Sequence, residues 1–344
     1  MFRWLSEPTR EEQRIGVDMT EDHVVPIFVF SLPRSGSTLT QRVIGAHSMV
    51  ATVSEPWILL PIIYTMRHAG VFAEYNHHVM TLAVDDLIAE LPCHKDDYYR
   101  AIRGFALNLY SKLCRNNEKY FLDKTPRYHL VSQDIVNAFP DGKFFILWRN
   151  PLAIAASIIE TWGHGKWSIY RFRIDLYDGL EALCSTLENS RECLSVFNYE
   201  GLIDGDEEWA RLFSDIGIEY DPDVLAGFTK TRLEGAMGDP TGTVDYKQIS
   251  SAPLAKWKET MANPLRKRWC KKYLEWIGGE RLVLMGYDYD ELRREVDAIP
   301  FSFRYLFSDL VWMPLGFMYC LLEPYVFIQK FRNILSRRHT RVHR

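Results

Sequence analysis

The sequence predicts an α/β fold in which a central, mainly parallel β-sheet is flanked by helices. Short apolar runs alternate with amphipathic runs along most of the chain, as in successive strand–helix units. The runs at 26–30 and 142–148 are the clearest candidates for buried strands. We also expect a helical insert after the second strand and an apolar, basic tail at the C-terminus.

The composition excludes several classes of protein. The chain has 344 residues, of which 47% are hydrophobic, so it can bury a large core. Its net charge of −4 gives no support for a nucleic-acid partner. The six cysteines include no C-x-x-C pair, which favours reduced thiols over disulfides or a zinc site. The polar N-terminal segment has no apolar signal region, so we expect a cytoplasmic protein.

The stretch 25–40 combines a strand, a small-residue loop and a helix start, the geometry of a P-loop-like phosphate cradle. A Walker A loop has a Gly where this chain has Ser31 and a Lys where it has Ser37. The missing Lys argues against a nucleoside triphosphatase, and Arg34 supplies a cation within the loop. The alternative is an ordinary strand–turn–helix connection.

Two charged residues are predicted just beyond short strands. Glu55 follows the apolar run 49–53, and Lys124 follows the run that begins at Tyr120. The carboxyl ends of strands are where ligands bind in open α/β sheets. The alternatives are a capping or salt-bridging role for Glu55 and an ion pair between Lys124 and its neighbour Asp123.

The strand at 142–148 leads to Arg149, which precedes a helix capped by Asn150 and opened by Pro151. This helix is expected to run from 152 to about 162, with Ser157 on its second turn. Arg149 and Ser157 could clamp one phosphate, although a structural Arg and a small packing Ser would give the same pattern.

The remaining elements follow from hydrophobic period and turn residues. Helices are predicted at 38–46, 61–91, 98–115, 169–191, 209–217 and 264–277, and another strand at 194–200. The loop-like segment 235–253 is long enough for a lid, and Lys247 is its candidate ligand-binding cation. Tyr64, Phe72 and Trp57 could stack on sugar rings or belong to the core.

The C-terminal segment combines apolar and basic residues. Residues 310–322 are uncharged, too few to span a bilayer and expected to be interrupted at Pro314. Residues 328–344 contain six Lys or Arg and no acid. The combination suggests contact of 301–344 with an anionic membrane surface. The alternative is a core hairpin with a frayed basic end.

These motifs resemble those of the sulfotransferases that use 3′-phosphoadenosine-5′-phosphosulfate (PAPS). The segment 31–38, SLPRSGST, is similar to the family's 5′-phosphosulfate loop. Arg149-Asn150-Pro151 with Ser157 is similar to its 3′-phosphate site, and Tyr199-Glu200 to a less specific landmark. The resemblance spans roughly 25–290. We therefore expect a lead-in at 1–24, a sulfotransferase domain at 25–297, and an apolar hairpin with a basic tail at 298–344.

The form PRSG[ST]T with a later Glu is more like the tyrosylprotein and bacterial members than the cytosolic small-molecule type. The latter carries Lys-Thr-His at its catalytic His, whereas Lys124-Thr125 is followed here by Pro126. The resemblance therefore implies Glu55 as the catalytic base, assisted by Lys124 and Arg34. It implies PAPS as co-substrate with no metal required, bound by Arg34, Ser35, Gly36, Ser37, Thr38, Arg149, Ser157 and Tyr199. To these we add Lys247, from the lid-like segment, as a cofactor-binding residue.

The function that follows is sulfuryl transfer from PAPS to a hydroxyl group, expected on a carbohydrate or glycolipid. Protein-tyrosine sulfation is the runner-up within the class. A kinase-like P-loop protein and a nucleotide-binding module that tethers a complex at the membrane are the rivals outside it. The expected location is the cytoplasm, at the inner face of the membrane if the tail binds lipid.

Overall fold

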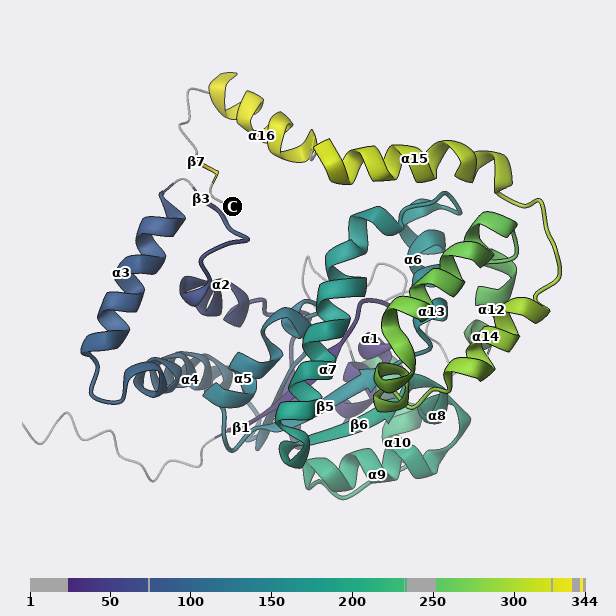
Figure 1. The fold of residues 1–344 in the computed structure, drawn as a ribbon. Coiled ribbons are helices and arrows are strands. Elements are labelled where there is room, and N and C mark those ends of the chain that lie inside the picture. Colours follow the sequence, from purple (N-terminus) through teal and green to yellow (C-terminus); the bar gives the residue numbers. More distant parts are fainter. Residues whose placement is uncertain are drawn as a thin grey trace, which may run out of the picture.

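A computed structural model describes residues 24–73, 75–231, 233, 252–322, 324–335 and 341–342. Five parallel strands form the central sheet in the order β2-β4-β1-β5-β6 (Figure 1). They are β1 (Val25–Ser31), β2 (Val50–Thr52), β4 (Tyr120–Asp123), β5 (Lys143–Trp148) and β6 (Leu194–Asn198). Each lies where an apolar run predicts a strand, so the expected α/β fold with a parallel sheet is confirmed.

The register of the sheet brings three of the predicted site segments to one edge. The central strand β1 pairs with β5 so that Ser31 lies beside Leu147, two residues before Arg149. On its other side β1 pairs with β4, and β4 pairs with β2. Because all these strands are parallel, the residues that follow their carboxyl ends gather at the same rim.

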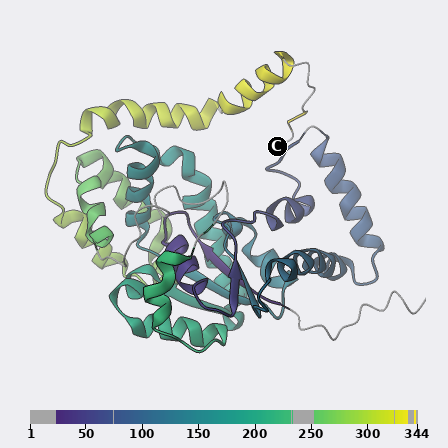
Figure 2. The same ribbon diagram turned by 180° about the vertical axis from the view of Figure 1, so that it is seen from behind.

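Alternate residues of β1 face two separate cores, as expected for a strand buried on both faces. Phe28 and Phe30 belong to the cluster beneath α4 (His94–Leu113), α5 (Ser132–Ala138), α6 (Pro151–Gly163) and α7 (Leu180–Asn189). Ile27 and Val29 belong to the cluster beneath α1 (Ser37–Ile44), α8 (Tyr199–Asp204), α9 (Asp206–Ile216) and α10 (Asp223–Gly227). Figure 2 shows this second layer from behind.

Two predicted helical stretches are divided into shorter elements. The first part of the insert, predicted as one helix at 61–91, contains α2 (Leu59–Ile63), η2 (Tyr64–Met66), the short strand β3 (Phe72–Ala73) and α3 (His77–Glu90). The stretch 169–191 contains the 3₁₀ turn η4 (Ile169–Phe172), the π-helical segment η5 (Ile174–Gly179) and α7. Shorter 3₁₀ segments are η3 (Tyr128–Val131), η6 (Arg191–Cys193) and η7 (Phe228–Lys230).

Three helices precede the tail. They are α12 (Ala252–Thr260), α13 (Pro264–Leu284) and α14 (Tyr289–Ala298). The helix predicted at 264–277 ends where α13 kinks, because Gly278 adopts a left-handed conformation with φ of 80°. Most of the segment 235–253, including Lys247, lies outside the described residues, as does nearly all of the lead-in 1–24.

The tail differs from the expected hairpin. Helix α15 (Leu306–Leu322) is followed by α16 (Pro324–Leu335), and the two run end to end along one side of the molecule (Figure 1). Pro314 lies inside α15 and does not interrupt it, contrary to the expectation. The helix continues because Asp309 before Pro314 and Gly316 after it are both packed on the body of the protein.

The short strand β7 (Arg341–Val342) pairs with β3 in the insert. The C-terminal segment therefore reaches from one flank of the fold to the other. Among the described residues, no helix combines the length and the apolar character that crossing a bilayer requires.

Candidate active site

The loop between β1 and α1 contains two left-handed residues, Arg34 with φ of 70° and Gly36 with φ of 91°. Glycine is required at 36 because a Cβ atom there would collide with the ring of Tyr199. Gly36 caps α1 without a side-chain hydrogen bond to its first turn. The positive end of α1 therefore faces the cavity with its backbone N–H groups, a geometry suited to an anion.

The predicted phosphate-binding residues contact one another. The Nη1 atom of Arg149 donates to the carbonyl oxygen of Arg34 at 2.8 Å, and the Nε atom of Arg34 donates to the hydroxyl of Ser157 at 3.1 Å. The guanidinium of Arg149 also lies 4.6 Å from the ring centroid of Tyr199. The sequence thus identified four residues that the fold assembles around the first loop.

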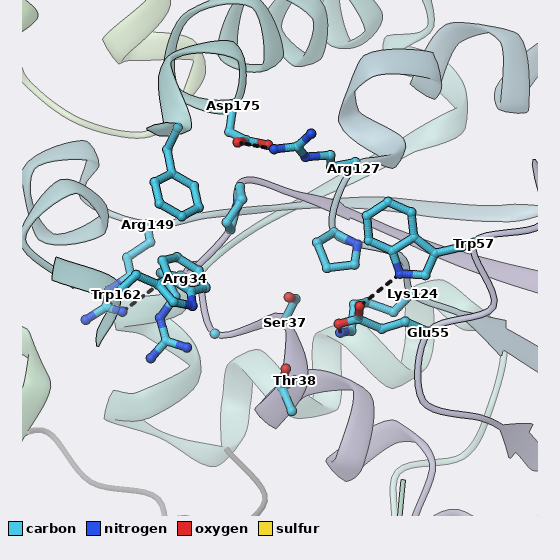
Figure 3. Close-up of a pocket in the computed structure, with 14 residues that line it drawn as sticks. Arg34, Ser37, Thr38, Glu55, Trp57, Lys124, Arg127, Arg149, Trp162 and Asp175 are labelled. Carbon is cyan, nitrogen blue, oxygen red and sulfur yellow. Dashed lines mark hydrogen bonds and ion pairs between the residues drawn. The ribbon is translucent and has the colours of Figure 1, made fainter. Parts of the chain in front are cut away.

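Glu55 and Lys124 form an ion pair in the cavity, with 2.8 Å between Oε1 and Nζ (Figure 3). Their side chains are only 7% and 2% exposed. The alternative pairing of Lys124 with Asp123 is not formed, because the Asp123 carboxylate accepts from the hydroxyls of Tyr110 and Tyr128 at 2.5 and 3.0 Å. A carboxylate and an ammonium from two different strand ends therefore meet beside the loop between β1 and α1.

Trp57 holds the carboxylate of Glu55, and Gln41 holds the segment that precedes it. The indole Nε1 atom of Trp57 donates to Oε2 at 3.1 Å, so each carboxylate oxygen has its own donor. The side-chain amide of Gln41, on α1, donates to the hydroxyl of Thr52 and to the carbonyl oxygens of Val53 and Ser54. The segment that carries Glu55 is therefore tied to helix α1, which begins at the loop after β1.

A buried carboxyl group links the segments that carry Glu55 and Lys124. Burial raises the pKa of Asp123 to about 6, although its hydrogen bonds lower it in part. The hydroxyl of Thr125 donates to Asp123 at 3.3 Å and accepts from the backbone N–H of Trp57 at 3.2 Å. Through the hydroxyl of Thr125, Asp123 thus connects the end of β4 with the loop after β2.

The opposite wall of the cavity combines aromatic and charged groups. Trp162 and Phe172 stack with their ring centroids 4.5 Å apart. Arg127 donates to the fully buried carboxylate of Asp175 at 3.1 Å, and the Nε2 atom of His129 lies 3.3 Å from the other oxygen. Figure 3 shows this wall facing Ser37, Thr38, Glu55 and Lys124 across the cavity.

The cavity between these walls measures about 210 Å³. Seven of the predicted site residues line it: Arg34, Gly36, Ser37, Thr38, Glu55, Lys124 and Arg149. Three others lie outside that lining: Ser35 is fully buried, and Ser157 and Tyr199 contact the two arginines. Among the aromatics considered for stacking, Trp57 lines the cavity, whereas Tyr64 packs against the core.

Four lining residues were not identified from the sequence: Arg127, Trp162, Phe172 and Asp175. Arg127 follows the strand end that carries Lys124, which is a usable signal. Asp175 lies in a helical stretch where nothing in the pattern distinguishes it from a solvated carboxylate.

The donor set suits an anionic ligand with two separated charges. Two guanidinium groups, one ammonium group and a helix N-terminus meet at one rim, and the buried hydroxyl of Ser35 in the loop has no hydrogen-bond partner. These residues fit the phosphosulfate and 3′-phosphate of PAPS. Within the described part of the chain, no three His, Cys, Asp or Glu side chains are grouped closely enough to hold a metal ion.

Comparison with known proteins agrees with the motifs. A family model described as "Sulfotransferase family" matches residues 26–222. The chain is 28% identical over 293 residues to the nodulation protein NoeE of Sinorhizobium fredii, covering 76% of this chain and 65% of NoeE. It is 22% identical over 275 residues to protein-tyrosine sulfotransferase 2 of Gallus gallus, covering 76% of this chain and 66% of that protein.

The chain therefore spans slightly less than two thirds of the length of these two relatives. Among solved structures, the sulfotransferase domain from the curacin biosynthetic pathway is 19% identical, with a TM-score of 0.47. That alignment covers 68% of this chain and 90% of the domain.

Proposed function

Because the chain belongs to the sulfotransferase family, we propose that it transfers a sulfuryl group from PAPS to a hydroxyl group. The observation that carries the proposal is the Glu55–Lys124 pair, which lies in the cavity beside the anion-binding loop and Arg34. It provides a carboxylate for proton removal and two cations for the charge that develops on the transferred group.

In the proposed reaction the acceptor oxygen attacks sulfur, and the bond between sulfur and the bridging phosphate oxygen breaks. Glu55 takes the proton of the acceptor hydroxyl. Lys124, Arg34 and the N–H groups at the start of α1 stabilise the negative charge on the sulfuryl and bridging oxygens. The products are a sulfate ester and 3′,5′-adenosine bisphosphate, and the proton remains on Glu55 until solvent removes it.

We assign the 3′-phosphate to Arg149, with Ser157 and Tyr199 as its neighbours. Arg149 is buried, with 7% of its surface exposed. Its guanidinium donates to the carbonyl oxygen of Arg34 and lies against the ring of Tyr199. An Arg held in this way is preorganised for a phosphate, because little side-chain freedom is lost on binding. Lys247 lies outside the described residues, and its role in cofactor binding stays a prediction.

For the acceptor we propose a carbohydrate or a lipid-linked hydroxyl compound. The cavity wall presents the rings of Trp57, Trp162 and Phe172 together with the Arg127–Asp175 pair. Aromatic faces and charged hydrogen-bonding groups suit the apolar faces and hydroxyls of a sugar ring. The chicken relative is named for sulfation of protein tyrosine, and the same aromatic wall would suit a phenol, so a tyrosine acceptor is the second candidate.

The first test is calorimetric titration of the full chain with 3′,5′-adenosine bisphosphate, with and without Mg²⁺, using ATP for comparison. We expect micromolar binding that ignores Mg²⁺ and exceeds the binding of ATP. A Mg²⁺-dependent preference for ATP would favour the kinase-like alternative. Binding of the bisphosphate with no turnover on any hydroxyl acceptor would favour a nucleotide-binding module.

A panel of sugar and tyrosine-peptide acceptors with radiolabelled PAPS then separates the two acceptor classes. Label transfer to an oligosaccharide or glycolipid supports the first candidate. Transfer to a tyrosine peptide alone would replace it with the second. A phenol has a lower pKa than a sugar hydroxyl, so the pH profile of turnover gives an independent distinction.

A further inference from the structure

Helix α15 is apolar on the face that points away from the protein. Side chains three or four residues apart face the core, from Asp309 through Trp312 and Met313 to Gly316 and Cys320. The opposite side carries large apolar residues that are 43–78% exposed: Phe307, Leu310, Val311, Leu315, Phe317, Met318, Leu321 and Leu322. A helix that is apolar all round is normally covered on every side.

The orientation of α15 is fixed by buried polar contacts. The guanidinium of Arg266 donates to both oxygens of Asp309, at 2.6 and 2.9 Å, and to the carbonyl oxygen of Gly165 at 2.7 Å. Arg266 and Asp309 are both fully buried. Gly316 lies against the ring of Tyr170, where a side chain would collide. The helix therefore cannot roll to bury its outer face without breaking a buried ion pair.

The exposed apolar surface continues beyond α15. Phe327, Phe331 and Leu335 on α16 are 72%, 56% and 70% exposed, and Phe301 and Phe303 before α15 are 61% and 67% exposed. We define the α15–α16 face by these residues and the outer residues of α15. The two helices that carry it run along one side of the molecule (Figures 1 and 2). Large apolar side chains exposed together on one element, unlike singly scattered ones, indicate a binding surface.

The charges around this face bear on the kind of partner that it suits. Asp309 is the acidic residue among the described residues of α15 and α16, and its charge is neutralised by the ion pair with Arg266. Exposed Arg304 lies beside α15, and exposed Lys166 places its ammonium over Trp312. The sequence 328–344 adds six Lys or Arg and no acid. Glu323, between the two helices, is the acid that the sequence adds there. The excess of cations over acids beside an apolar stripe favours a bilayer interface that contains anionic lipid.

We propose that the α15–α16 face binds an anionic membrane surface, with both helices lying in the plane of the interface. Helix α15, about 26 Å long, cannot cross the bilayer because its inner face is bound to the protein. The docking would embed the outer phenylalanines and leucines at the boundary of headgroups and acyl chains, and the flanking cations would contact lipid phosphates.

The position of the face also bears on the acceptor, a step that rests on the proposed function. The short segment η4 carries Tyr170, which packs on α15, and Phe172, which lines the cavity. A single 3₁₀ turn therefore connects helix α15 with the proposed acceptor wall, by which we mean the cavity side formed by Trp57, Arg127, Trp162, Phe172 and Asp175. This proximity favours an acceptor presented at the lipid surface over one taken from solution.

The test is co-sedimentation of the full chain with vesicles of phosphatidylcholine alone, or of phosphatidylcholine mixed with about one third phosphatidylglycerol, an anionic lipid. We compare the wild type with Phe317→Glu/Leu321→Glu, which places two charges on the face. Phe105→Glu/Val283→Glu is the matched control, because those residues are exposed apolar positions on α4 and α13. We expect binding to phosphatidylglycerol vesicles that high salt weakens, and a loss of about tenfold or more in the first variant only.

Titration with 3′,5′-adenosine bisphosphate and light scattering are run on all three proteins. Unchanged nucleotide affinity in the face variant would show that it is folded, so that its loss of vesicle binding belongs to the face. No binding of the wild type to anionic vesicles, or equal loss in the control, would overturn the proposal. A wild-type dimer that the face variant converts to a monomer would instead assign the surface to a second copy of the chain. Failure of the nucleotide to bind any of the three would count against the proposed function and leave the vesicle result standing.

Discussion

The buried pair of Lys124 and Glu55 allows structural and chemical roles to be separated by substitution. Lys124→Met leaves the Glu55 carboxylate with the indole N–H of Trp57 as its described donor. An unpaired buried charge costs about 3–5 kcal/mol, and we expect the free energy of unfolding at pH 7 to fall by about that amount. Glu55→Gln leaves the buried ammonium of Lys124 without its counter-charge and should cost about 3–5 kcal/mol, less what the amide oxygen recovers as a hydrogen-bond acceptor.

The double variant Glu55→Gln/Lys124→Met removes both charges together. Its cost should be smaller than the sum of the single costs by about 1–3 kcal/mol, because no isolated charge remains. Urea denaturation of the wild type and the three variants, followed by fluorescence and circular dichroism, measures this difference. Costs that add to within about 0.5 kcal/mol would refute a direct interaction between the two side chains.

Turnover distinguishes the chemical role from the structural one. Glu55→Gln should bind 3′,5′-adenosine bisphosphate nearly as well as the wild type and lose about 10²–10⁴ in turnover, the typical share of a general base. Trp57→Phe is the matched control, because it removes the donor to Oε2 and retains the carboxylate and a ring. If Glu55→Gln retained turnover, another group would have to be the base.

Three further predictions follow from the site. Arg149→Ala should weaken binding of the bisphosphate nucleotide by about 10- to 100-fold and leave binding of adenosine 5′-phosphosulfate nearly unchanged. Calorimetry measures both affinities, and equal losses would contradict the assignment of the 3′-phosphate to Arg149. Arg127→Met should raise the KM for the acceptor without changing nucleotide affinity, whereas a parallel loss of both would place Arg127 on the nucleotide side. The third concerns Asp123: burial raises its pKa from 3.8 to about 6, so the stability it contributes is present below pH 3.8 and lost as the pH rises through 6. Asp123→Asn should therefore gain about 3 kcal/mol relative to the wild type between pH 4 and 7 in urea titrations, and a constant difference would exclude this titration.

The ends of the strands were predictable because uncharged apolar runs such as 26–30 are typical of buried strands, and each strand ends where polar residues resume. Once five such runs are parallel, the residues after them must share a rim, and this places Glu55, Lys124 and Arg149 near one another. The pairing of Lys124 with Glu55 and not with Asp123 could not be predicted. It depends on Tyr110, from helix α4, which donates a hydrogen bond to the Asp123 carboxylate.

The acceptor wall and the tail were harder to predict for related reasons. Asp175 reaches the cavity from a π-helical segment, a local geometry that hydrophobic periodicity does not distinguish from an ordinary helix. Pro314 was expected to break α15, but the contacts of Asp309 and Gly316 on either side hold the helix together. In both cases tertiary contacts distant in sequence decide the outcome.

The hydrogen bonds of Gln41 have a consequence for how acceptor preference can diverge among related chains. These bonds connect the segment of Glu55 to helix α1, so the proposed base and the proposed donor site keep a fixed position relative to each other. The acceptor wall comes from other segments, including those of Arg127 and Phe172. Within the wall, Trp57 donates to Glu55 and Trp162 lies under Arg34, whereas Phe172 stacks on Trp162 and Asp175 pairs with Arg127. Substitutions at Phe172 and Asp175 should therefore change acceptor preference with the least effect on the proposed reacting groups.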